Sequence, residues 1–310
     1  MSTIRRLRAL VPMRWLAAGV MGMACTVSAQ ALTPISDDEL ASVHGRDGIA
    51  FNLLGFSLGG PNLSVTFSSS KGDANPFALT LSDISMSRSD DPTSTYSDPY
   101  TLTLTQRGNG MSDVITLTDP QNAQGLLKWQ FAANFSLYDG NTTFNGGGLL
   151  VQNLQSYGNS VSIASSSDPN AQGIELGLQL QFNVGALSLR PNGQGNTSLL
   201  NDPNQPEQLS FQGIHLAAAT ANGTLGTTPW ALANVTNQPL TVNTVTNADG
   251  SASLHMNLAW PSAGYTAPAG SLAIDDINFA SAAGPSMDLG SSHIGSMQIQ
   301  YLDIKFRTGP

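Results

Sequence analysis

The sequence predicts an all-β protein, either an elongated β-sandwich or an irregular, solenoid-like stack of short strands, with one short N-terminal helix. From residue 49 onward, apolar residues mostly alternate with polar ones, which indicates strands with one buried face. Clusters of Pro, Gly, Asn and Asp separate these stretches, as turns require. Only 11% of the residues are charged, against about a quarter in a typical protein, so Ser, Thr, Asn and Gln must provide much of the solubility.

The first 31 residues have the features of a secretory signal peptide. Four arginines precede an apolar run from Trp15 to Val27, and the small-x-small sequence Ala29-Gln30-Ala31 follows it. A basic head, a short apolar segment and a small-residue end are typical of a cleaved export signal, and the run is short for a membrane anchor. We therefore expect export, cleavage after Ala31 and no transmembrane segment in the mature chain.

Cleavage would also change the chemistry available to the protein. The only cysteine, Cys25, lies within the leader, so the mature chain would have no disulfide, thiolate metal site or cysteine nucleophile. Eight Lys and Arg would remain against 21 Asp and Glu, a formal charge of −13. Such a surface repels phosphate backbones, so nucleic acid is not an expected partner.

A short helix is predicted from Ser36 to Gly45. Ser36 and Glu39 have the S-x-x-E spacing of a capping box, in which each satisfies a backbone amide of the first turn. Leu40 and Val43 form one apolar stripe, and Gly45 can end the helix in the left-handed conformation. About two turns of helix do not persist alone in water, so we expect this helix either to cover an edge of the β-structure or to dock a partner.

The turn Asp47-Gly48 leads into the first predicted strand, which begins at Ile49. We therefore divide the chain into a signal peptide (1–31), a capped helix and turn (32–48), and a β-rich domain (49–310).

Within the β-rich domain, the apolar positions repeatedly break their alternation. A step of three inserts one residue, so the side chains would change face unless the chain bulges, bends or passes to another sheet there. The breaks fall mostly on small or turn-forming residues, such as Gly185-Ala186 and Gln212-Gly213. Steps of two, three and two recur in six places: residues 51–58, 79–86, 182–189, 209–216, 272–279 and 297–304.

No catalytic, cofactor or metal site is predicted. The stretch Gly290 to Gly295 comes close to the G-x-S-x-G elbow of serine hydrolases, but Ile294 takes the place of the last glycine, and we interpret the stretch as a turn. The four histidines are far apart in sequence and lack the spacing of a helical metal pair. His215 and His255 alternate with apolar neighbours, so they are expected to point outward from strands.

The N-terminal motifs resemble those of a family of exported bacterial proteins that includes pilus-system components. The resemblance covers about 30 of the 310 residues and implies an envelope or surface role connected with fimbria-like assembly. It transfers no catalytic residue. The matching features are the signal peptide, Pro34, the acidic helix Asp37-Asp38-Glu39-Leu40, then Val43, Gly45, the turn Asp47-Gly48 and the strand Ile49-Ala50-Phe51.

Together these features favour a non-enzymatic, extracytoplasmic protein of the periplasm, outer-membrane surface or external medium. Its expected role is structural or interactive, as an accessory to a pilus-like assembly, with other envelope or surface proteins as partners. Self-association through strand edges is also expected, since an unpaired edge offers free backbone groups.

The alternative is a secreted carbohydrate-binding or carbohydrate-active β-protein. Trp129 and Trp260 lie in alternating apolar stretches and are therefore expected in the core. A third class, a lipid carrier, would need a long unbroken apolar face. In the carbohydrate alternative, the aromatic residues that stack on sugar rings are Trp129, Trp230, Trp260, Tyr96, Tyr100 and Tyr138.

Overall fold

The computed structural model describes residues 48–60, 62–68, 77–91, 93, 98–108, 111–166, 172–191, 193–194, 207–280 and 285–306. Contacts divide the chain into two units, Met1–Gly45 and Arg46–Pro310, and the description below concerns the second. The predicted helix, with Ser36, Glu39, Leu40, Val43 and Gly45, lies outside the described residues, as does Asp47.

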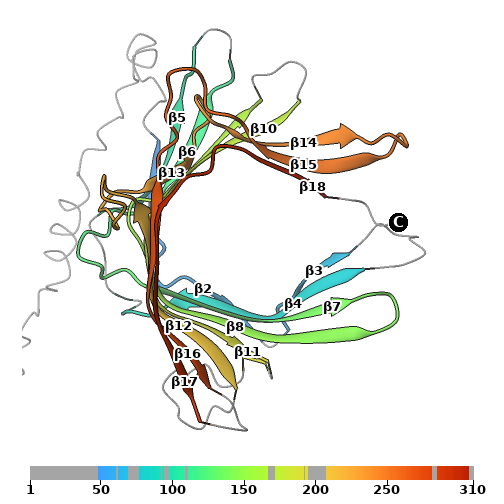
Figure 1. The fold of residues 1–310 in the computed structure, drawn as a ribbon, viewed down its shortest axis with the longest axis vertical. Coiled ribbons are helices and arrows are strands. Elements are labelled where there is room, and N and C mark those ends of the chain that lie inside the picture. Colours follow the sequence, from blue (N-terminus) through green and yellow to red (C-terminus); the bar gives the residue numbers. More distant parts are fainter. Residues whose placement is uncertain are drawn as a thin grey trace, which may run out of the picture. The chain divides into compact units, whose positions relative to one another are not determined.

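The described residues form two antiparallel sheets of nine strands each (Figure 1). The all-β prediction is confirmed, and the first strand begins at Ile49, as expected. In spatial order, sheet I contains β1 (Ile49–Phe51), β5 (Tyr100–Thr105), β6 (Val114–Thr118), β9 (Ser160–Ser165), β10 (Gly173–Leu180), β14 (Leu240–Thr246), β15 (Ala252–Leu258) and β18 (Leu302–Phe306), with β13 (Trp230–Ala233) also paired to β10. Sheet II contains β17 (Met287–Met297), β16 (Gly270–Ala280), β12 (Gln208–Ala218), β11 (Phe182–Arg190), β8 (Thr143–Ser156), β7 (Trp129–Tyr138), β4 (Ala78–Arg88) and β2 (Ser57–Gly59), with β3 (Val65–Ser68) also paired to β4.

Four of the six three-residue steps are irregularities within single strands of sheet II: β4, β11, β12 and β16. Those of β11, β12 and β16 lie side by side, because the pairing places Gly185, Gly213 and Asp275 opposite one another. Asn153 of β8 continues the same line. Gly213 and Asn153 have positive φ, +60° and +52°, which turns the chain so that the next apolar side chain returns to the same face. The extra residues therefore bend the strands without moving their apolar side chains to the other face.

The other two steps carry the chain from one sheet to the other. Phe51 belongs to β1 of sheet I, and Leu58 belongs to β2 of sheet II; Gly55 lies between them with φ +64°. Met297 ends β17 of sheet II, and Leu302 begins β18 of sheet I. The three-residue steps therefore have two causes in this chain: irregularities within a strand and crossings from one sheet to the other.

Each sheet has one apolar face, and we call these the inner faces. Side chains directly paired across neighbouring strands share a face, so the pairing identifies the members of each row. In sheet I, one such row is Leu104, Ile115, Ile163, Leu176, Leu240 and Leu258. In sheet II, a corresponding row is Leu58, Met86, Phe131, Val151, Leu187, Phe211 and Ile277.

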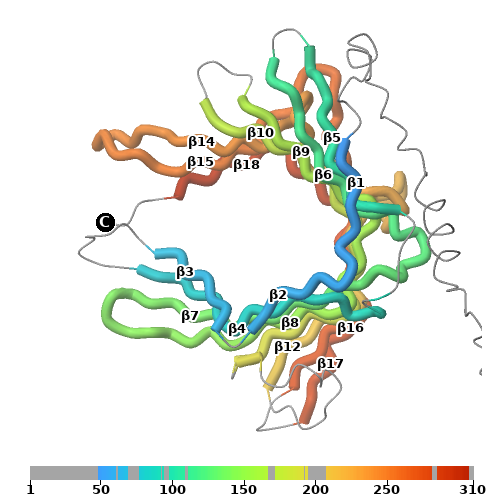
Figure 2. Tube along the Cα trace, turned by 180° about the vertical axis from the view of Figure 1, so that it is seen from behind, coloured from blue at the N-terminus to red at the C-terminus, as the bar shows by residue number. Residues whose placement is uncertain are grey.

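The two inner faces meet in one buried cluster. Tyr100 of sheet I and Trp129 of sheet II are both buried there with Leu127, and the Trp129 Nε1 donates to the Tyr100 hydroxyl at 3.2 Å. Phe51 stacks on Tyr100, and Phe56 packs edge-on against Trp129. From this side, where β12 also contacts β10 and β13, the sheets diverge (Figure 2). The inner faces are therefore turned toward each other.

Replacing Gly213 with Ala should lower the free energy of unfolding by about 1–3 kcal/mol. Its φ of +60° is unfavourable for any L side chain, and the added Cβ would collide with the Asp275 carboxylate. The matched control is Gly250→Ala, at φ +84°, where the added Cβ would meet no atom within 4 Å. Urea unfolding followed by circular dichroism measures both. An equal loss at the two positions would contradict the role of the close approach to Asp275.

Candidate functional site

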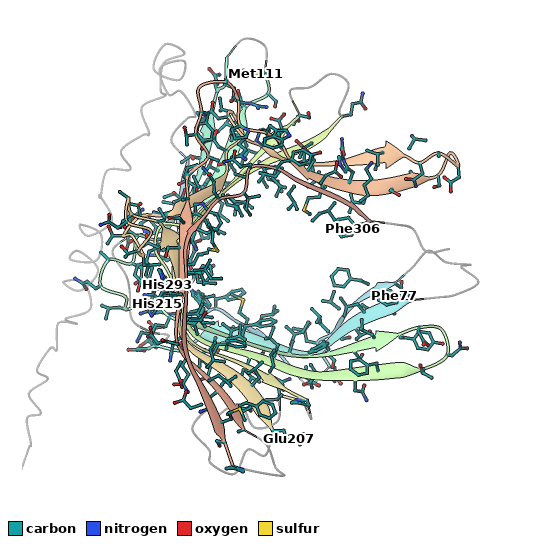
Figure 3. The ribbon with its side chains drawn as sticks, viewed as in Figure 1. Phe77, Met111, Glu207, His215, His293 and Phe306 are labelled. Atoms are coloured by element: carbon teal, nitrogen blue, oxygen red, sulfur yellow. The ribbon has the colours of Figure 1, made fainter. Side chains whose placement is uncertain are left out.

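The inner faces remain largely uncovered beyond the buried cluster, which is their most unusual property. Eighteen large apolar side chains on the two faces have exposed fractions between 37 and 64%. Figure 3 labels Phe306, at the end of β18, and Phe77, just before β4, in the region where the sheets have diverged. The exposed members are Ile49, Leu104, Ile115, Leu117, Val161, Ile163, Ile174, Leu254, Leu302 and Phe306 in sheet I, and Leu58, Val65, Phe67, Phe144, Leu189, Phe279, Met287 and Ile294 in sheet II.

The opposite, outer face of sheet I is polar where β6 and β9 pair. Thr116 follows Ile115 in β6 and pairs with Ser162, which precedes Ile163 in β9. The hydroxyl oxygens of Thr116 and Ser162 lie 2.8 Å apart on the outer face. Arg107 also packs on this side of sheet I, where its Nη1 donates to Glu175 Oε2 at 2.7 Å. Both partners of this ion pair are buried. The contrast between the two faces shows that the exposed apolar side chains are a property of the inner face and not of the surface in general.

Two similar polar ladders tie neighbouring strands together on the outer faces. In sheet II, His215 Nδ1 lies 2.8 Å from Asn183 Oδ1, and His215 Nε2 lies 3.2 Å from Asp275 Oδ2. In sheet I, His255 Nδ1 lies 2.8 Å from Asn243 Oδ1, and His255 Nε2 lies 3.1 Å from Asp303 Oδ1. The prediction that both histidines point outward is therefore confirmed. The ladders themselves were not predicted, because their members come from three separate strands.

The interpretation of Gly290 to Gly295 as a turn is wrong, since the whole stretch lies within β17. His293 extends toward β16, where its Nε2 lies 3.0 Å from the Ser271 hydroxyl. Ser271 is 0% exposed, so a substrate in solution could not reach this hydroxyl. The pair therefore joins two strands and does not form an accessible nucleophile.

Trp129 and Trp260 differ in exposure, which the sequence did not predict. Trp129 is in the core, as expected, with 5% of its surface exposed, whereas Trp260 is 65% exposed and its placement in the core was wrong. Trp260 stacks on Tyr301, with ring centroids 5.4 Å apart and planes 13° from parallel. An exposed tryptophan held by a second ring is available for contact with a ligand.

Polar groups adjoin this aromatic pair on the outer face of β15 and β18. The Tyr301 hydroxyl donates to Asp303 Oδ2 at 3.1 Å and also bonds to Asn257. The hydrogen bond to Asp303 raises the pKa of Tyr301 and lowers the pKa of Asp303. The carboxylate and the phenol are thus held in their charged and neutral forms respectively at neutral pH.

The other aromatic residues proposed for sugar stacking are less accessible. Tyr100, Trp129 and Trp230 are buried, and the Trp230 Nε1 donates to the Pro268 carbonyl. Tyr138 is partly exposed, but its hydroxyl donates to the Gly140 carbonyl. Tyr96 lies outside the described residues.

Gly48 is the one predicted docking residue that the structure describes. It precedes β1, and a Cβ at this position would collide with the Leu102 carbonyl of β5. Gly48 therefore permits the close approach of the first strand to β5. This is a structural role, and the docking role assigned to residues 36–48 stays a prediction.

No three His, Cys, Asp or Glu side chains among the described residues are grouped to hold a metal ion. No helix in this part of the chain is long and apolar enough to cross a membrane. A cavity of about 390 Å³ opens beside β7 and β8, and its lining includes Asn134, Asn145 and Pro191 without any charged side chain.

Comparisons with known proteins do not assign this chain to a family. No family model matches the chain, and no curated protein or solved structure is significantly similar to it.

Proposed function

We propose that this protein is a non-catalytic, exported protein of the cell envelope or surface that works by holding another polypeptide between its inner faces. The observation that carries the proposal is the exposure of large apolar side chains on the inner face of both sheets. The export signal predicted at residues 1–31 supports the location, and the resemblance of residues 34–51 supports an accessory role in a pilus-like assembly.

The size of the inner faces favours a protein partner. At about 150–250 Å² per large side chain, exposed fractions of 37–64% leave on the order of 1,500 Å² of apolar surface. The largest apolar patch of a typical monomer is about 300–600 Å². A stable protein interface buries about 1,200–2,000 Å² in total, so this surface is large enough for one.

The backbone limits how the partner can bind. Strands β6, β9, β14 and β15 are hydrogen-bonded on both sides, so an additional strand cannot pair with them. The partner must instead present apolar side chains from a helix or sheet whose own backbone is already satisfied. Strand edges offer a second mode, and within the described part of the chain β17 is an edge of 11 residues.

A pair of double variants tests the role of the inner face. Ile115→Asp with Ile163→Asp places charge on the inner face, and Thr116→Asp with Ser162→Asp places it on the outer face of the same two strands. We expect the purified protein to bind an apolar fluorescent dye such as bis-ANS, and the inner variant to bind measurably less dye than the outer variant, which should bind as much as the wild type. Circular dichroism checks that both remain folded. Absence of dye binding to the wild type would contradict an accessible inner face.

The partner can be identified by photo-crosslinking in the host cell. A photoreactive residue in place of Ile163 should form an adduct with another polypeptide, whereas the same residue in place of Ser162, on the outer face, should not. Equal adducts from both positions would contradict the proposal. Adducts with lipid alone would assign the surface to lipid carriage instead, and adducts between two copies would indicate self-association.

A further inference from the structure

We propose a second binding site, on the outer face of sheet I, where Trp260 and Tyr301 form a platform for a β-linked oligosaccharide. This site is separate from the inner faces, and it does not depend on the function proposed for them. The ring pair lies at the ends of β15 and β18, which Figure 1 shows next to each other.

The rings provide an apolar surface with the right geometry. Trp260 and Tyr301 are 65% and 42% exposed, and their rings are stacked with planes 13° from parallel, so Tyr301 supports one face of the indole and the opposite face of the indole is the flat aromatic surface. The faces of aromatic rings carry partial negative charge, which attracts the C–H groups on the flat side of a sugar ring. A β-linked pyranose with equatorial hydroxyls presents such a side.

The neighbouring polar groups provide directional contacts. Asp303 accepts hydrogen bonds from Tyr301 and pairs with His255, but an ionised carboxylate has about four acceptor positions. Its side chain is 36% exposed, so it can also accept from a sugar hydroxyl. Asn257 is beside it and offers both a donor and an acceptor. The exposed indole face, with a carboxylate and an amide at the hydroxyl of the ring that supports it, offers both apolar and polar contacts to a sugar.

Two other ligand classes fit less well. A quaternary ammonium ion is recognised by rings that surround it, and this pair is nearly parallel. A nucleic acid base could stack on the rings, but the carboxylate of Asp303 and the formal charge of −9 repel its phosphates.

The test measures binding of chitohexaose, cellohexaose and choline by isothermal titration calorimetry and by tryptophan emission. We expect one of the two oligosaccharides to bind, and Trp260→Ala to weaken that binding about tenfold or more, since stacking on one aromatic ring contributes that much. Tyr301→Phe keeps the ring and should retain most of the affinity. The matched control is Phe144→Ala, which removes an aromatic side chain of similar exposure, 64%, from the inner face.

Three results would overturn this inference. They are binding of neither oligosaccharide at millimolar concentration, equal affinity in wild type and Trp260→Ala, and binding of choline alone. Circular dichroism of each variant shows whether a loss comes from unfolding, and Tyr301→Ala, which removes the ring that supports the indole and should also weaken binding, keeps the test decisive if Trp260→Ala does not fold.

Discussion

Replacing Trp129 with Ala is expected to lower the free energy of unfolding by about 3–5 kcal/mol. The indole is 5% exposed and packs in a buried cluster that contains side chains of both inner faces. Its removal leaves a cavity there and takes the donor from the Tyr100 hydroxyl. Urea unfolding followed by far-ultraviolet circular dichroism measures the change without relying on tryptophan emission.

Trp260→Ala is the matched control, because it makes the same change at a residue that is 65% exposed. Its loss should stay within about 1 kcal/mol, since only the stacking on Tyr301 disappears. Similar losses in the two variants would contradict the placement of Trp129 in the core and Trp260 on the surface. Trp129→Phe should recover part of the stability, because the ring is kept and only the hydrogen bond is lost.

Arg107→Met is expected to cost about 3–5 kcal/mol, because it removes the cation from a buried ion pair. The Arg107 Nη1 donates to Glu175 at 2.7 Å, and the guanidinium also donates to Ser112 and to the Ser165 carbonyl. The side chains of Arg107 and Glu175 are only 7% and 4% exposed. Without Arg107, the ionised Glu175 would remain in a site that is shielded from water.

The double variant Arg107→Met with Glu175→Gln separates the pair from its parts. It should be more stable than Arg107→Met alone, because the uncompensated carboxylate is gone. Lys305→Met, at an exposed cation on β18, should change stability by no more than about 0.5 kcal/mol. Urea unfolding at low and high salt completes the test. A loss at Arg107 that disappears in high salt would indicate a screened surface pair instead of a buried one.

Local patterns predicted the strands and their breaks well. The alternation that begins at Ile49 identified the first strand and the outward direction of His215 and His255, because side-chain direction in a strand has a period of two. The three-residue steps identified the irregular positions, such as Gly213, because an inserted residue disturbs that period wherever it falls. These properties belong to a few neighbouring residues, so the sequence carries them directly.

The same patterns failed where neighbours distant in sequence decide the outcome. Trp260 lies in an apolar stretch, but its indole stacks on Tyr301 at the surface and is 65% exposed. Gly290 and Gly295 suggested a turn, but pairing with β16 holds the residues between them in an extended strand. Propensity for a turn is a weak preference, which the hydrogen bonds of a neighbouring strand can override.

The sequence by itself determined that residues 49–310 form a β-protein of low charge density, with alternating apolar and polar positions along its strands. Only the tertiary structure decided which strands pair, that the two apolar faces are turned toward each other, and that much of both faces stays exposed. It alone brought Trp260 to Tyr301 and Asp303. The physical reason is that alternation records which side chains share a face, whereas burial depends on what the rest of the chain places over that face.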